Sequence, residues 1–178
     1  MTDLVRLRPI SLDDIPALEL LREEENASYN WFGFAQPGRL RRNVTEGTTF
    51  GEDNGALTVV RAAQVLGDVS WHVESYGPNR SHAFNMGISL LPAARGKGYG
   101  TRAQRLLAEY LFANTAVNRL EASTDITNIA EQKSLAKAGF TREGVLRGAQ
   151  FRNGKWNDLV LYSFLREDLT EDADGTQG

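Results

Sequence analysis

The chain has 178 residues, which is enough for one domain with a substantial core and too few for two domains of ordinary size. Hydrophobic residues make up 41% of it and charged residues 24%, a balance typical of a globular protein that excludes a disordered or a membrane chain. The net charge of −3 offers no basic face for a nucleic acid, so we expect no DNA or RNA partner.

Residue types that are absent or rare exclude several kinds of chemistry. The sequence contains no cysteine, which excludes disulfides, thiolate metal sites and a covalent acyl-cysteine intermediate. His72 and His82 are too few for an imidazole-rich metal site, and we expect no metal. No apolar run reaches the ~20 residues that span a bilayer, and the charged N-terminus lacks the apolar core of a leader, so we expect a cytoplasmic protein with no membrane partner.

The hydrophobic pattern predicts strands alternating with helices. Residues 4–8 alternate as in a strand, and Ser11, Asp13 and Asp14 then offer three possible N-caps for a helix that must begin near Pro16. We expect a short helix at 38–44, a hairpin of strands at 56–62 and 64–72, a strand at 83–91, a helix at 100–113, a strand at 120–124, a helix at 128–138, and closing strands at 144–151 and 156–164.

This order of elements predicts one α/β (α+β) domain over residues 1–169, with a mixed sheet of about seven strands flanked by about four helices. The acidic tail at 170–178 is expected to be disordered. The helix at 100–113 is amphipathic. Its expected apolar face holds Tyr99, Ala103, Leu106, Leu107, Tyr110 and Leu111, and its expected polar face holds Arg102, Gln104, Arg105 and Glu109.

The most informative segment is a glycine-rich turn between the fourth predicted strand and this helix. Gly96, Gly98 and Gly100 allow the backbone to turn tightly and bring successive N–H groups to one concave side. The unpaired amides of the helix N-terminus carry a partial positive charge, and Arg95 and Lys97 add full charges beside it. A pyrophosphate is therefore favoured there, although an exposed strand-to-helix turn is the alternative.

Spacing excludes the two common nucleotide motifs. A Rossmann fingerprint needs G-x-G-x-x-G after the first strand, whereas these glycines read G-x-G-x-G in the second half of the chain. A P-loop needs Ser or Thr directly after its lysine, and Lys97 lies between two glycines.

The segment R-G-K-G-Y-G at 95–100 resembles the pyrophosphate loop of the GNAT N-acetyltransferase family, whose pattern is Arg or Gln, two variable residues, Gly, a variable residue, and Gly or Ala. A second family motif follows in the right order and separation. Residues 128–140 read N-I-A-E-Q-K-S-L-A-K-A-G-F and depart from that motif only at Glu131. Asn128 and Gly139 are equally well explained as the N-cap and the C′ residue of a helix.

The closing segment 148–158 resembles the RimJ/RimL branch of the family, whose members acetylate protein N-termini, antibiotics or other small amines. The resemblance implies an enzyme that transfers an acetyl group from acetyl-CoA directly to a primary amine, such as a protein N-terminus, an antibiotic or a polyamine. Its partners would be acetyl-CoA and the amine acceptor, and a homodimer is left open. The alternative is a non-catalytic module that binds acyl-CoA for regulation.

The resemblance also implies the cofactor site. The strand at 85–91 should splay from its neighbour, so that its free backbone groups pair with the pantetheine arm as an added strand would. Leu90 is the first such partner, Asn128 would also bind the pantetheine, and the amides of the turn would hold the pyrophosphate. The implied cofactor-binding residues are Leu90, Arg95, Gly96, Lys97, Gly98, Tyr99, Gly100, Thr101 and Asn128.

The chain departs from the family at the positions where relatives carry residues that transfer protons. Related enzymes often carry Glu as a base at the position of Asn85, and an asparagine side chain cannot act as a base. A water relay from Asn85 to Glu74 or His72 is possible, but both are also explained as exposed strand residues.

The acid that would protonate the departing thiolate is missing too. Leu135 stands where many relatives have Tyr, and Glu131 stands where RimJ/RimL-like members often have Ser. Glu131 is equally well explained as the second half of a capping box with Asn128, and Ser134 is a poor substitute because it points to one side of that helical stripe. The candidate catalytic residues are Asn85, Glu131 and Ser134.

We expect the acceptor site between an aromatic loop and the closing hairpin. Aromatic walls would desolvate the amine and lower its pKa, and the carboxylate of Asp158 would attract the cation on arrival. Core packing is the alternative explanation of the aromatic residues. The candidate substrate-binding residues are Trp31, Phe32, Glu74, Phe151, Trp156 and Asp158, with Phe34 in the same loop.

Overall fold

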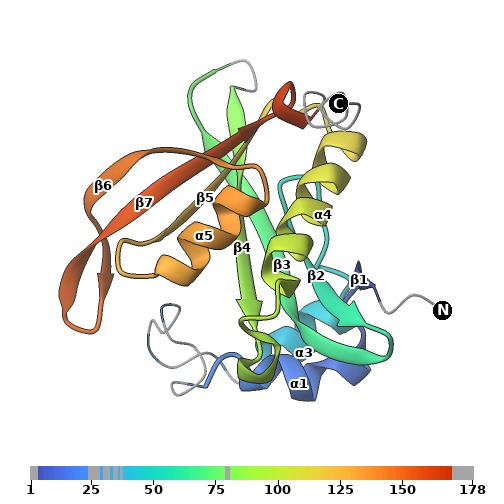
Figure 1. Cartoon of the computed structure of the whole chain (residues 1–178). Coiled ribbons are helices and arrows are strands. Elements are labelled where there is room, and N and C mark those ends of the chain that lie inside the picture. The colour runs from blue at the N-terminus through green and yellow to red at the C-terminus, as the bar shows by residue number, and fades with distance from the viewer. Residues whose placement is uncertain are drawn as a thin grey trace.

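The computed structural model describes residues 4–23, 29, 33, 36, 38–78 and 81–169. Within these residues, seven strands form one mixed sheet in the order β1-β2-β3-β4-β5-β7-β6 and four helices pack on it, which confirms the expected α/β (α+β) fold (Figure 1). No helix of the described part is long and apolar enough to cross a membrane. The strands are β1 (Val5–Pro9), β2 (Asn54–Arg61), β3 (Gln64–Ser75), β4 (His82–Leu90), β5 (Arg119–Asp125), β6 (Thr141–Arg152) and β7 (Lys155–Leu165); the helices are α1 (Ile15–Leu20), α3 (Arg39–Thr45), α4 (Tyr99–Asn114) and α5 (Ile129–Lys137).

Asp14 connects the beginning of the chain to the sheet. Ser11 caps the short 3-10 turn that leads into α1, and its N–H donates to the Asp14 carboxylate at 2.9 Å. Arg8 donates to the same carboxylate at 2.6 Å, and the Thr58 hydroxyl of β2 donates at 2.9 Å. Burial alone would raise the pKa of Asp14, but these hydrogen bonds outweigh it and bring that pKa to about 2.

The C-terminus of α5 follows the rule for a glycine-terminated helix. Phe140 N–H donates to the Leu135 carbonyl at 3.0 Å, and Gly139 N–H donates to the Ala136 carbonyl at 3.2 Å. This pattern needs a left-handed residue, and Gly139 has a φ of +100°. The role of Gly139 as the C′ residue is thereby confirmed.

The helices cover the two faces of the sheet unequally. The long helix α4 packs over the main core on one face, together with Phe84 and Met86 of β4. On the other face, α1 and α3 enclose a smaller cluster around Leu18. Because successive strand residues point to opposite faces, Asn85 lies on the face of α1 and α3.

The sheet opens between β4 and β5, its only parallel pair within the described residues. These strands pair only at Phe84 with Leu120 and at Asn85 with Glu121. Beyond Asn85, β4 continues to Leu90 while staying paired with β3 on its other side. The expected splay is confirmed, and it leaves one edge of β4 without a strand partner.

Candidate cofactor and acceptor site

The glycine-rich turn lies at the open end of β4 and begins α4. Gly96 and Gly98 have φ values of +71° and +78°, and Gly98 is the N-cap of α4. The first helical bond of α4 runs from Arg102 N–H to the Gly98 carbonyl at 3.2 Å, so the amides before Arg102 have no partner within the helix. A Cβ atom at Gly96 or Gly98 would meet no atom within 4 Å. The turn therefore combines two left-handed glycines with open space at their Cβ positions and helix amides that have no helical partner. We call this turn, residues 96–101, the cradle, since an anion could bind to such amides.

Gly100 and Arg95 bring the cradle into contact with α5 and β4. A Cβ atom on Gly100 would lie 3.4 Å from the Ser134 hydroxyl and 3.5 Å from a methyl group of Leu90, so this residue marks a close approach of α4 to α5 and β4. Arg95 Nε donates to the Leu90 carbonyl at 2.9 Å. Leu90, the expected partner of pantetheine, thus already accepts one hydrogen bond through its carbonyl.

Asn128 acts as the N-cap of α5. Its Oδ1 accepts from Glu131 N–H at 3.3 Å, and its Nδ2 donates to the Thr124 hydroxyl at 3.0 Å. Asn128 N–H donates to the Asp125 carbonyl at 2.8 Å and not to Glu131. The alternative explanation of Glu131 as the second half of a capping box with Asn128 is therefore wrong, because the Glu131 carboxylate turns toward α4.

Glu131 instead ends a chain of polar side chains between α4 and α5. Gln104 Nε2 donates to Glu131 Oε1 in a short hydrogen bond. Gln104 Oε1 accepts from the Ser134 hydroxyl at 2.8 Å, and that hydroxyl lies 3.1 Å from the hydroxyl of Thr101. Ser134 therefore does contact the cradle helix, although helical spacing pointed it to the side.

Gln104 corrects the expected polar face of α4, since it is only 4% exposed. Gln104 lies on one helical stripe with Ala108 and Leu111, both fully buried. That apolar spacing of four and seven residues was the signal available in the sequence.

Asn85 occupies a cross-strand row of polar residues on the face of α1 and α3. His72 of β3 lies directly opposite it on one side and Glu121 of β5 on the other, while Glu74 pairs with Ala83. His72 and Glu74 are both exposed. The structure thus brings His72, and not Glu74, alongside Asn85.

Sequence reasoning missed Glu121, which is only 2% exposed. Its Oε1 accepts hydrogen bonds from the Tyr76 hydroxyl and from Arg119 Nε. Two donors therefore bind the Glu121 carboxylate beside Asn85. The hydrogen bond from Tyr76 links β5 to the end of β3.

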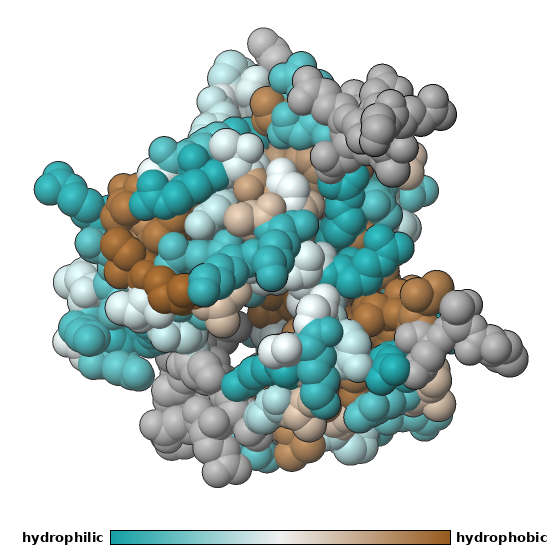
Figure 2. Space-filling view, viewed as in Figure 1, coloured by the Kyte–Doolittle hydropathy of each residue, from teal (hydrophilic) through white to brown (hydrophobic). Residues whose placement is uncertain are grey.

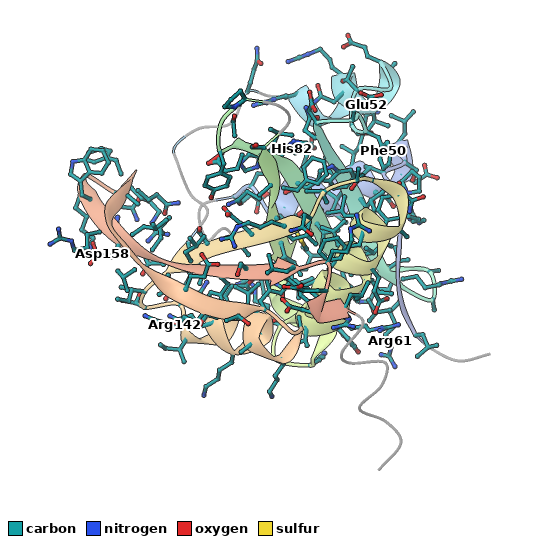
Figure 3. All side chains as sticks on the ribbon, turned by 90° about the horizontal axis from the view of Figure 1, so that it is seen from above. Phe50, Glu52, Arg61, His82, Arg142 and Asp158 are labelled. Atoms are coloured by element: carbon teal, nitrogen blue, oxygen red, sulfur yellow. The ribbon has the colours of Figure 1, made fainter. Side chains whose placement is uncertain are left out.

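A cavity of about 510 Å³ lies beside the closing hairpin, and Trp156 and Asp158 line it. Asp158 lies on the protruding hairpin, far from Phe50 and Glu52 (Figure 3). Its Oδ1 also accepts from Gly148 N–H at 2.7 Å. Phe151 stacks edge-to-face on Trp156 with ring centroids 5.4 Å apart, and it does not line the cavity.

Trp31, Phe32 and Phe34 lie outside the described residues. Tyr29 from the same part of the chain is described and lines the cavity. Figure 2 shows the surface hollowed between the half of the molecule that carries α5 and the part below it. The cavity lies on the hairpin side of the expected acceptor site, and Glu74 is not among its lining residues.

A buried ion pair forms the inner wall of this cavity. Arg152 is 7% exposed and Asp125 is 5% exposed, and they pair through a short contact. Arg152 also donates to the Tyr29 carbonyl, and its guanidinium lies 5.2 Å from the Tyr29 ring centroid. Burial opposes ionisation of Asp125, but hydrogen bonds from Thr127 and Arg152 lower its pKa. Sequence reasoning missed this pair because the two residues are far apart in the chain.

Comparison with known proteins places these features in one family. The sequence model of the acetyltransferase (GNAT) domain family matches residues 5–141 of this chain. Over 83 residues the chain is 36% identical to the probable N-acetyltransferase YjcK of Bacillus subtilis (strain 168), and the match covers 47% of this chain and 46% of that protein. The chain thus spans about half the length of the curated relatives it matches.

Two solved structures share the whole fold at low sequence identity. Spermidine N-acetyltransferase from Vibrio cholerae, in complex with CoA and spermine, has a TM-score of 0.79 at 19% identity and covers 93% of this chain and 98% of its own. RimJ from Mycobacterium smegmatis, in complex with CoA-disulfide, has a TM-score of 0.74 at 20% identity and covers 96% and 89%. With a family match over most of its length, a splayed parallel pair and a glycine cradle at the open end, this chain belongs to the acetyltransferase (GNAT) family.

Proposed function

We propose that this protein is an N-acetyltransferase that moves an acetyl group from acetyl-CoA directly to a primary amine. The observation that carries the proposal is the placement of the amide cradle at the end of the free edge of β4. A pyrophosphate on the amides between Gly98 and Arg102 would direct the pantetheine arm along this edge toward Asn85. The thioester would then lie where the two strands separate.

The residues present suit a reaction without a covalent enzyme intermediate. A free alkylamine has a pKa of ~10.4, so the acceptor must lose a proton before it attacks the thioester carbonyl. Backbone N–H groups on the free edge of β4 are placed to stabilise the oxyanion. Positioning and desolvation of the amine supply most of the rate acceleration, because residue 85 of β4 is an asparagine, which cannot act as a base.

The proposal is tested by following free thiol release from acetyl-CoA in the presence of a panel of amines: spermine, peptides with a free N-terminus, and aminoglycosides. An increase in product mass by one acetyl group identifies the acceptor. Binding of coenzyme A without thiol release for any amine would favour the non-catalytic acyl-CoA-binding module instead. The buried Leu135, which takes the place of a hydroxyl-bearing residue, is the observation that favours this second function.

Asn85→Ala is expected to lower turnover by roughly tenfold or less, since Asn85 can orient a water or the amine but cannot take a proton. The KM for acetyl-CoA should stay unchanged. Steady-state kinetics with an acceptor found in the panel measure both parameters. A loss on the order of a thousandfold would contradict the proposal and assign Asn85 a central role in the chemistry.

Asp158→Asn and Trp156→Ala are expected to raise the KM for the amine several-fold without changing the KM for acetyl-CoA. Asparagine keeps an oxygen that accepts from Gly148 N–H, so the first change removes the charge and spares the hairpin. Glu52→Gln removes the same charge on the opposite side of the molecule and serves as the control (Figure 3). Unchanged amine kinetics in Asp158→Asn and Trp156→Ala would place the acceptor site away from the hairpin.

A further inference from the structure

Four side chains form a continuous hydrogen-bonded chain from the phosphate cradle to Glu131. The chain begins at Thr101, the third residue of α4, and passes through Ser134 of α5 to Gln104 of α4. It ends at the carboxylate of Glu131. Gln104 is 4% exposed, so the middle of the chain is shielded from water.

The donors in this chain all point the same way. Ser134 has one hydroxyl proton and gives it to Gln104 Oε1, so it must accept from Thr101. The amide of Gln104 then donates to Glu131. This order suits an ionised Glu131, and it commits the Thr101 proton to the protein interior.

A protonated Glu131 reverses the order. Its O–H becomes a donor, the Gln104 amide turns over to accept it, and the freed NH₂ group donates to Ser134. Ser134 can then donate to the Thr101 oxygen. The Thr101 O–H no longer donates to Ser134, so it is free to donate to another acceptor. Helical side chains tilt toward the N-terminus of their helix, so the released hydroxyl of Thr101 lies toward the cradle.

We propose that Glu131 is a positioning residue for the cofactor, and that its protonation state decides whether the Thr101 hydroxyl donates to a cofactor phosphate or into the protein. This inference rests on the proposed binding of coenzyme A at the cradle. It assigns a function to the residue at which the chain departs from the second family motif.

The surroundings of Glu131 bring the pKa of its carboxyl close to neutral pH. Burial raises the pKa of Glu131 to about 7, although the hydrogen bond from Gln104 opposes this rise. Glu131 forms no ion pair among the described residues. The elements packed against α5 are α4, β5 and β6. The charged side chains on these elements and on α5 itself are Arg102, Arg105 and Glu109 of α4, Lys133 and Lys137 of α5, Arg119, Glu121 and Asp125 of β5, and Arg142, Glu143, Arg147 and Arg152 of β6.

Several of these groups are engaged elsewhere. Arg105 pairs with Glu109, and Asp125 pairs with Arg152. Lys133 and Lys137 are exposed. Below pH 7 the protonated chain therefore offers a donor to the phosphate, and above pH 7 the donor is withdrawn while a negative charge is added.

The experiment is a titration of 3′-dephospho-CoA by calorimetry between pH 6 and pH 8.5, because this ligand keeps the pyrophosphate and lacks the 3′-phosphate that would itself titrate near pH ~6. For the unaltered protein, the Kd is expected to rise on the order of tenfold across this range, the effect of one hydrogen bond to a charged group. Thr101→Ser should retain the effect. Glu131→Gln, Ser134→Ala and Thr101→Val should each flatten it, because each breaks or neutralises the same chain.

The outcomes separate the inference from the proposed function. A protein that binds no coenzyme A at any pH would overturn the proposed function. Tight binding with the same pH profile in the unaltered protein, Glu131→Gln and Thr101→Val would overturn the inference alone. The Ser134→Ala variant guards against a local effect at either end, since it leaves both Glu131 and Thr101 in place.

Discussion

Replacement of Gly98 by valine is expected to abolish the binding of coenzyme A while the domain stays folded. The φ of Gly98 is +78°, and its missing Cβ would point into space that no protein atom occupies. A valine side chain would fill the space above the free amides of α4, where a pyrophosphate would lie. The left-handed backbone would add a strain of about 1–2 kcal/mol.

The control for this variant is Gly47→Val. Gly47 has a φ of +69°, also has no atom within 4 Å of a built Cβ, and lies in the turn after α3. Both variants should lose similar stability in thermal unfolding, and only Gly98→Val should lose ligand binding in calorimetry. Equal affinity in Gly98→Val and the unaltered protein would mean that the cradle is elsewhere.

The change Asp125→Ala is expected to lower the free energy of unfolding by about 3–5 kcal/mol, because it leaves the buried guanidinium of Arg152 without its counter-ion. This pair joins the end of β5 to the hairpin of β6 and β7 and to the backbone of Tyr29. The same variant should therefore raise the KM for the amine, since it loosens a wall of the acceptor cavity.

The matched control is Glu109→Ala, which breaks the pair with Arg105 on α4. The Glu109 side chain is 41% exposed, so its loss should cost only about 0.3–0.5 kcal/mol. Urea unfolding of both variants at neutral pH measures the difference. A loss in Asp125→Ala no larger than that in Glu109→Ala would show that Arg152 finds other partners or reaches water.

The same ion pair has a pH dependence with a defined sign. The folded-state pKa of Asp125 is lowered, so the stability it contributes is present above the pKa of ~3.9 expected in the unfolded chain. That stability is lost as the pH falls through the folded-state value. Glu131 has the opposite sign: its pKa of about 7 means that stability is lost as the pH rises from about 4.3 toward 7.

The sequence alone determined the order of the elements and the cradle. Strand and helix periods depend on neighbours within a few residues, and Gly96 and Gly98 are needed because the backbone there is left-handed. Asn128 and Gly139 likewise mark the two ends of α5 through local capping geometry. These features are short-range, so the spacing of residues along the chain is enough to identify them.

Only the tertiary structure decided which polar residues meet. The predicted polar face of α4 included Gln104, but α5 packs on that side and buries it against Glu131. Asp125 and Arg152 are brought together by the return of the hairpin past the end of β5, and Glu121 is set beside Asn85 by a parallel pairing that lasts for two residues. Burial and pairing of charges depend on what a distant segment places opposite them, which is why local pattern could name the cradle but not the polar chain or ion pair around it.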